Sequence, residues 1–92
     1  MEKGKQDILR LALQPYTIEL LHKLEKEPAR FKDLNKQIPN EMTLSNKLRK
    51  LLEYGLIEIV PIKIGRHYAN CYTISVKGKR LLTLLKQVGQ LE

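Results

Sequence analysis

Cysteine is nearly absent from this sequence, and long apolar runs are missing altogether. The only cysteine, Cys71, cannot form an intrachain disulfide, which argues against a disulfide-stabilised secreted domain and favours a reducing compartment. The apolar runs are far shorter than the roughly 20 residues of a membrane span, and the first residues are polar and charged, unlike a signal peptide. We therefore expect a cytoplasmic protein that has no membrane partner.

Acidic residues are missing from most of the second half of the chain. Residues 59–91 contain six lysines and arginines and no aspartate or glutamate, whereas residues 1–27 carry five charges of each sign. The net charge of the whole chain is +7. This asymmetry favours a polyanionic partner contacted mainly by the second half. A membrane face or simple solubility would also account for a basic surface.

The residue patterns typical of enzymes are absent as well. The five glycines are scattered singly and make no phosphate-binding loop. The sequence contains no paired carboxylates, nucleophile motif or metal-ligand spacing, and neither His22 nor His67 has a partner at a recognisable distance along the chain. We predict that the protein is not an enzyme and that it carries no metal and no cofactor. No motif identifies a small-molecule effector.

An amphipathic pattern over residues 43–54 is the clearest positive signal. Its leucines recur at the i, i+4, i+7 and i+8 spacing of one helix face. Thr43 is the expected N-cap, and Gly55 is expected to end the helix with a positive φ. The opposite face and its flanks carry Ser45, Asn46, Lys47, Arg49 and Lys50. Such side chains read base edges or bind phosphates, so we interpret this segment as a DNA recognition helix. An ordinary surface helix with a solvated basic face is the alternative.

Three shorter helices are predicted before the recognition helix, over residues 5–13, about 16–26, and 31 to 37 or 38. In the second, we expect Ile18, Leu21 and Leu24 to face the core. The residues that break the helices are Pro15, Glu27-Pro28 and the turn 39–42. In the third helix Phe31, Leu34 and Ile38 share one face, and Arg30 and Lys32 are free to face outward. Residues 31–54 thus predict a helix-turn-helix.

The pattern changes to that of strands after Gly55. Residues 56–62 are rich in β-branched side chains and predict a strand, which Pro61 confines to an edge or an end. A turn at Gly65, longer than a two-residue hairpin, leads to a second strand over residues 71–74. Ser75 then caps a last helix that ends near residue 88. The order predicts one winged-helix domain over residues 1–92, an α+β fold that is mostly α, with its wing over residues 56–74.

The two terminal helices, about 5–13 and 76–88, have apolar faces wider than one small core can cover. Exposed apolar patches of this extent usually mark an interface. We therefore expect a homodimer built from these helices. The predicted interface residues are Ile8, Leu9, Leu11, Leu13, Leu81, Leu84, Leu85 and Val88.

Five segments resemble the winged-helix transcription regulators of the HxlR type, within the broader MarR-like and ArsR-like group. They are residues 15–21 (PYTIELL), 28–34 (PARFKDL), 43–49 (TLSNKLR), 55–57 (GLI) and 72–78 (YTISVKG).

The resemblance implies a dimeric regulator that binds a pseudo-palindromic operator. It assigns Ser45, Asn46 and Arg49 to base-edge or nearby phosphate contacts, and it places Lys63 and Arg66 on the wing. The chain departs from the family pattern in carrying Ser75 where threonine is usual. It also lacks the N-terminal sensing cysteine that such regulators commonly have, so cysteine-based sensing by that route is not implied.

Taken together, these observations predict a sequence-specific regulator that binds double-stranded DNA as a homodimer. The predicted DNA-binding residues are Arg30, Lys32, Thr43, Ser45, Asn46, Lys47, Arg49, Lys50, Lys63, Arg66 and His67. The alternative is a winged helix that serves as a protein-interaction or RNA-binding module without operator specificity. Such a module would more often show apolar residues on the outer face of the recognition helix.

Two further features of the wing have more than one reading. We expect Tyr68 and Tyr72 to pack against the protein, although both could stack on the bases of a single strand. We expect Cys71 to be a half-buried strand residue, with a redox-responsive thiol as the alternative.

Overall fold

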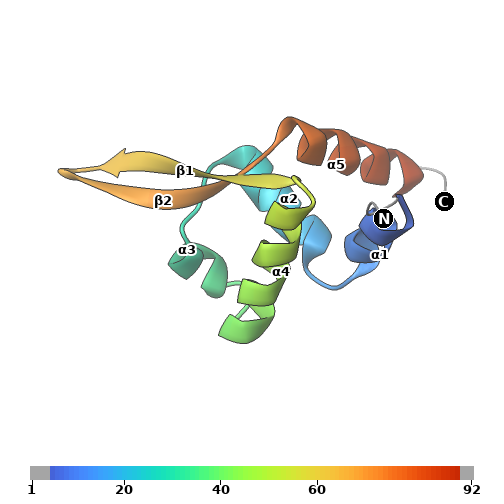
Figure 1. The fold of residues 1–92 in the computed structure, drawn as a ribbon, viewed down its shortest axis with the longest axis horizontal. Helices are drawn as coiled ribbons and strands as arrows, with labels where there is room; N and C mark the ends of the chain where they lie inside the picture. The colour runs from blue at the N-terminus through green and yellow to red at the C-terminus, as the bar shows by residue number, and fades with distance from the viewer. Residues whose placement is uncertain (1–4, 90–92) are drawn as a thin grey trace.

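The computed structural model of the chain describes residues 5–89, which form five helices and one two-stranded antiparallel sheet (Figure 1). In chain order these elements are α1 (Lys5–Leu13), α2 (Thr17–Lys26), α3 (Phe31–Asn35), α4 (Glu41–Glu53), β1 (Ile57–Ile64), β2 (His67–Ile74) and α5 (Val76–Gly89). The hairpin projects from one end of the molecule, and α1 and α5 lie at the other end (Figure 1). This is the winged helix-turn-helix that the sequence predicted.

The hydrophobic core takes side chains from every one of these elements. Leu44, Leu48 and Leu51 of the α4 stripe are buried as expected, with Leu44 and Leu51 fully inaccessible to solvent, and Leu52 is half-buried against the core. Full burial of a leucine side chain stabilises the fold by roughly 1.5–3 kcal/mol relative to leaving it exposed. The core consists of Leu11, Leu20, Leu21, Leu24, Ala29, Leu34, Ile38, Leu44, Leu48, Leu51, Leu56, Ile57, Ile74 and Leu82.

The connection between α1 and α2 differs in detail from the expectation. Tyr16 does not begin α2; it precedes the helix with a φ of 72°, a left-handed conformation that is uncommon for a residue with a side chain. Thr17 starts the helix fully buried and donates a hydrogen bond from Oγ1 to the carbonyl of Leu11 at 2.6 Å. Because Leu20 rather than Ile18 takes the inward position, the expectation that Ile18 faces the core is wrong, and its side chain is exposed.

The helix-turn-helix has a shorter first helix and a longer second helix than predicted. α3 ends at Asn35. The Asn35 side chain donates a hydrogen bond to the carbonyl of Ile38 at 2.8 Å, and this bond closes the turn that follows. α4 begins at Glu41, and its N-cap is Asn40, whose Oδ1 accepts from the Thr43 N–H at 2.9 Å. The prediction that Thr43 caps α4 is therefore wrong. Asn40 serves because its side-chain oxygen satisfies an N–H of the first turn.

The wing is longer than the sequence indicated, because both strands continue almost to the tip. β1 and β2 pair from Ile57 opposite Ile74 to Ile64 opposite His67, which leaves a two-residue turn at Gly65-Arg66. Gly65 has a φ of 62°, as predicted. Arg66 has a negative φ, so the turn follows the type II′ pattern. The expectation of a longer loop is wrong.

A short backbone bridge joins the wing to the segment before α3. Ala29 and Tyr72 exchange two backbone hydrogen bonds, of 3.0 and 2.8 Å, along the free edge of β2. The bridge is antiparallel, so Ala29 acts as a one-residue third strand. It fixes the base of the wing against the helix-turn-helix.

α5 is fixed at its first turn. Ser75 Oγ accepts from the Gly78 N–H at 3.0 Å, as expected of an N-cap, and it donates to the Gly55 carbonyl at 2.6 Å. Gly78 lies so close to Leu56 that a Cβ there would be 2.1 Å from the Leu56 carbonyl oxygen. α5 therefore packs against the chain that links α4 to the wing.

Neither a membrane-spanning helix nor a cluster of metal ligands is found in the described part of the chain. Between residues 5 and 89, none of the helices combines the length and the apolar character that crossing a membrane requires. In the same stretch, histidine, cysteine and acidic side chains do not gather in threes that could hold a metal ion.

Candidate nucleic-acid interface

The outer face of α4 is polar, basic and open to solvent. Ser45, Asn46, Arg49 and Lys50 are all exposed, as is Thr43 near the start of the helix. The leucine stripe on the inner face is buried, so the fold holds these side chains outward.

Two of the outer-face side chains contact each other. The Arg49 guanidinium donates to Asn46 Oδ1 at 3.1 Å, one turn apart on the same face. Because Asn46 Oδ1 orients the guanidinium, the two side chains form a joint group of donors and acceptors. Such a group matches the edges that base pairs present in the major groove.

Lys47 is the exception among the predicted contacts on α4. Its exposed fraction is only 7 %, and its Nζ donates to Gln14 Oε1 at 2.5 Å, on the connection between α1 and α2. Burial lowers the pKa of the Lys47 ammonium, and the nearby charge of Lys50 lowers it further. The expectation that Lys47 belongs to the exposed basic face is therefore corrected. Its position at the flank of that face lets a long side chain turn inward.

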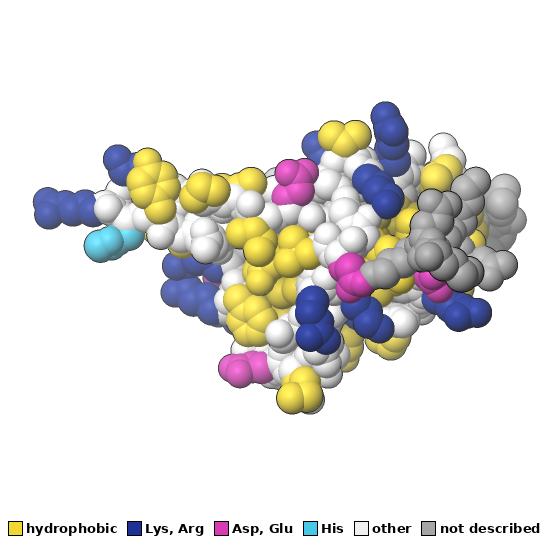
Figure 2. All heavy atoms as spheres, viewed as in Figure 1, with side chains coloured by type: hydrophobic (Ala, Val, Ile, Leu, Met, Phe, Trp, Pro, Cys, Tyr) yellow, Lys and Arg dark blue, Asp and Glu magenta, His cyan; other side chains and the backbone are white. Residues whose placement is uncertain are grey.

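The tip of the wing forms a second exposed basic region. Lys63, Arg66 and His67 are exposed at or beside the turn, and Figure 2 shows lysine and arginine side chains with a histidine at the outer end of the hairpin. Tyr68 is 70 % exposed and pairs across the strands with Lys63. The expectation that Tyr68 packs against the protein is wrong, because the tip extends beyond the body. Tyr72, nearer the base, packs against the core as expected.

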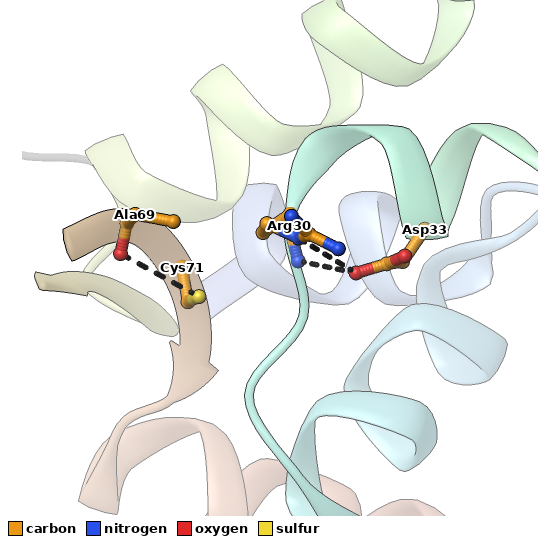
Figure 3. Close-up of polar contacts among 4 residues, drawn as sticks. All are labelled: Arg30, Asp33, Ala69 and Cys71. Carbon is orange, nitrogen blue, oxygen red and sulfur yellow. Dashed lines mark hydrogen bonds and ion pairs between the residues drawn. The ribbon is translucent and has the colours of Figure 1, made fainter. Parts of the chain in front are cut away.

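Arg30 and Lys32 flank the first turn of α3 in different ways. Lys32 is exposed, whereas Arg30 is half-buried and engaged with Asp33. The Asp33 carboxylate accepts from the Arg30 N–H at 3.2 Å and from Nε at 3.5 Å (Figure 3). The backbone hydrogen bond from Arg30 is the main cause of a lowered pKa for Asp33. Arg30 therefore serves partly to start α3.

The end of α4 is held by backbone and side-chain hydrogen bonds just before the wing begins. Gly55 has a φ of 72°, as predicted, and Leu56 N–H bonds to the Leu51 carbonyl at 2.9 Å in a Schellman arrangement. Lys77 Nζ donates to the Tyr54 carbonyl at 2.8 Å. Lys77 was not among the residues predicted to contact α4. A cation near a helix C-terminus would have been the signal, but only folding brings α5 there.

The terminal helices leave only part of their predicted interface uncovered. Leu13 is 80 % exposed, and Leu9, Leu84 and Val88 are also exposed. Ile8, Leu81 and Leu85 are half-buried. Leu11 is 2 % exposed and belongs to the core. Its prediction as an interface residue is corrected, because α1 turns this leucine toward α2. α1 and α5 lie at the same end of the molecule (Figure 1).

Cys71 lies inside the protein near the base of the wing. Its exposed fraction is 4 %, lower than the half-buried position expected, and its Sγ donates weakly to the Ala69 carbonyl at 3.7 Å (Figure 3). A thiol in this position behaves as a small hydrophobic side chain.

Several solved structures of transcription regulators have the same overall fold as this chain. The structure is similar to the reduced form of the transcriptional regulator YodB from B. subtilis, with a TM-score of 0.79 and 22% sequence identity over 98% of this chain and 90% of that chain. For quinone-bound YodB the TM-score is 0.75 at 20% identity, over 99% and 96% of the two chains. For a protein described as a MarR-family regulator from Porphyromonas gingivalis W83, the TM-score is 0.70 at 16% identity, over 98% and 92%. No curated protein sequence matches the chain.

The family follows from the sequence as a whole. The model of the HxlR-like helix-turn-helix family matches residues 14–92, which include the helix-turn-helix, the wing and α5. Members are DNA-binding transcription regulators rather than enzymes. The chain belongs to the HxlR-like helix-turn-helix family.

Proposed function

We propose that the protein regulates transcription as a twofold homodimer that recognises a pseudo-palindromic operator. In each subunit α4 enters the major groove and the wing contacts the adjacent backbone. The observation that carries the proposal is the outer face of α4, where Asn46 and Arg49 are exposed and in contact with each other, opposite the face that buries three leucines in the core.

Asn46 and Arg49 are proposed to read bases. Asparagine can pair with adenine through two hydrogen bonds and arginine with guanine, each worth roughly 1–3 kcal/mol of discrimination against the wrong base. Ser45, Thr43 and Lys50 lie beside them on the exposed surface. Their hydroxyl and ammonium groups suit phosphate contacts that fix the register of the helix on the duplex.

The wing is proposed to bind the backbone without reading sequence. Lys63 and Arg66 stand on either side of Gly65 at the tip, and His67 follows directly. A narrow two-residue turn with exposed cations can follow the phosphates or enter a narrow minor groove. Lys32, exposed on α3, adds a further charge on the helix-turn-helix itself.

The homodimer is proposed to form through α1 and α5. Leu9, Leu13, Leu84 and Val88 are exposed on these two helices, and large exposed apolar side chains favour association. A dimer of this kind would place two recognition helices roughly 34 Å apart, in successive major grooves. Such a regulator acts on the chromosome in the cytoplasm, where a lone unpaired cysteine also fits.

Selection of bound sequences from random duplexes tests the proposal first. A dimeric reader enriches a palindrome with two half-sites about one helical turn apart. Enrichment of a single half-site would contradict the dimer. No enrichment at all would favour a protein-interaction or RNA-binding module.

Binding isotherms at several salt concentrations then separate the roles of α4 and the wing. Asn46→Ala and Arg49→Ala should weaken binding to the selected operator much more than to a scrambled duplex. Lys63→Ala and Arg66→Ala should weaken both equally and reduce the slope of log affinity against log salt by about one each. Lys86→Ala is a charge-matched control on α5, expected to change neither. If the wing variants altered sequence preference instead, the two roles would be reversed.

A further inference from the structure

Lys47 lies on the proposed recognition helix, but its side chain points away from solvent and its ammonium group lies against the protein. Its Nζ donates to the side-chain oxygen of Gln14, which lies 33 residues earlier, directly after α1. A buried ammonium is costly unless a polar group receives it, so the bond with Gln14 accounts for the inward position.

The partner of Lys47 is itself held in place. Gln14 N–H bonds to the Leu11 carbonyl at 3.1 Å, and the Gln14 carbonyl accepts from the Thr17 N–H at 3.4 Å. Thr17 Oγ1 donates a hydrogen bond to the same Leu11 carbonyl at 2.6 Å, and Thr17 and Leu11 are both buried. Tyr16, in its left-handed conformation, completes this tight connection. The backbone of Gln14 is therefore held in a fixed turn, and its side chain, on an exposed residue, reaches from that turn to Lys47.

α1 and the C-terminal end of α4 also share a cleft. Asp7, Arg10 and Leu11 of α1 line a small cleft together with Lys50 and Tyr54 of the α4 segment. The last two turns of α1 thus border the C-terminal end of α4, beside Lys50.

The other inner side chains of α4 that the core holds are leucines, and apolar packing does not depend strongly on direction. The bond from Lys47 adds a tether between one side of α4 and the connection between α1 and α2, and a tether at that side resists rotation of α4 about its axis. Lys47 directly follows Asn46 and stands two residues before Arg49. A change in its position would therefore move both proposed base-reading side chains.

We propose that Lys47 is a positioning residue: its bond with Gln14 sets the rotation of α4 and couples the end of α1 to the reading of the operator. The proposal rests on the function proposed above, since α1 is one of the two proposed dimer helices. Lys47 does not contact DNA. A movement of α1 on dimer formation would reach the recognition helix through Gln14.

The test compares Lys47→Met, Gln14→Leu and Lys50→Met on the selected operator and on scrambled duplex. Lys47→Met and Gln14→Leu should each lower the ratio of the two affinities by roughly fivefold or more, the usual size of coupling between packed sites. The double variant should lose no more than either single variant, since both remove the same bond. The salt slope should stay unchanged. Lys50→Met, the matched lysine control, should instead weaken both duplexes and reduce the slope by about one.

Hydrogen exchange supplies a readout that needs no operator. Exchange of the amides of residues 44–50 should become faster in Gln14→Leu, whereas Gln14→Glu, which keeps an acceptor for Lys47, should exchange like the parent protein. Thermal unfolding of each variant identifies any general loss of stability.

Each possible outcome decides the question. If Lys47→Met reduces the salt slope and weakens both duplexes equally, Lys47 is a phosphate contact and the proposal fails. If Gln14→Leu leaves both discrimination and exchange unchanged, the bond does not position α4, and the proposal also fails. If the parent protein shows no operator preference, the proposed function fails by itself, and the exchange measurement still decides the role of Lys47.

Discussion

Replacement of Gly78 by alanine should destabilise the protein, although alanine is the better helix former. Gly78 lies in the first turn of α5, where the helix crosses the link between α4 and the wing. An added Cβ would be 2.1 Å from the Leu56 carbonyl oxygen and 2.7 Å from Cγ1 of Ile74. The isoleucine side chain can adjust, but the carbonyl belongs to the backbone, so α5 must move outward.

The magnitude follows from three terms. Overpacking of a close contact costs about 1–3 kcal/mol. Moving the Leu56 carbonyl also strains its hydrogen bond from Ser75 N–H, now 3.1 Å long, which is worth about 1 kcal/mol. The gain in helix propensity from glycine to alanine, about 1 kcal/mol, offsets part of this loss. The net destabilisation is about 2 kcal/mol, which lowers the melting temperature of a domain of this size by about 10 °C.

Thermal unfolding followed by circular dichroism measures this effect. Thr83→Ala is the control, because Thr83 is exposed on the same helix and should change the melting temperature by only a degree or two, upward if at all. A Gly78→Ala protein as stable as the parent would refute the reasoning. It would mean that α5 does not approach Leu56 as closely as the structure has it.

Three further predictions concern assembly, acid stability and the thiol. Leu84→Glu should convert the proposed dimer to a monomer in light scattering while Thr83→Glu does not, and a parent protein that is already monomeric at micromolar concentration would contradict the interface. The pKa of Asp33 in the folded state lies below its ordinary value of 3.8. Its contribution to stability is therefore present at neutral pH and lost as the pH falls through that lowered value, so the parent should lose more melting temperature than Asp33→Asn between about pH 5 and about pH 3; equal losses would contradict this. Cys71→Ser should bind DNA about as well as the parent with or without reductant, and a covalent dimer with altered affinity after oxidation would overturn this expectation.

Most of the architecture could be predicted from the sequence, because local periodicity distinguishes helices from strands. The leucine spacing of α4 predicted both the helix and its buried face. Gly55 and Gly65 were found at positions that need positive φ, and Ser75 was found as a cap, since each of these requirements lies within a few residues of the chain. The exposed polar face with Asn46 and Arg49 followed from the same periodicity.

The ends of elements were harder to predict, because neighbours in space shift them. Asn40 rather than Thr43 caps α4, although both residue types are good caps and only the folded geometry distinguishes them. The outer parts of the wing strands carry few β-branched residues, and their pairing depends on the partner strand rather than on their own propensity. The two-residue type II′ turn could nevertheless have been predicted, because such turns have glycine at their first central position, and here Gly65 precedes Arg66.

The packing of helices against one another sets which apolar and charged side chains turn inward, and this could not be predicted from the sequence. Leu11 and Ile18 exchanged their expected environments because the angle between α1 and α2, not the periodicity of either helix, sets which side faces the core. Lys47 looks like its basic neighbours in the sequence, yet it is buried because Gln14, 33 residues away, supplies an acceptor for its ammonium. Gly78 is required by the approach of a carbonyl that lies more than twenty residues earlier. Contacts between distant parts of a chain leave no periodic trace in the sequence, so the folded structure alone reveals them.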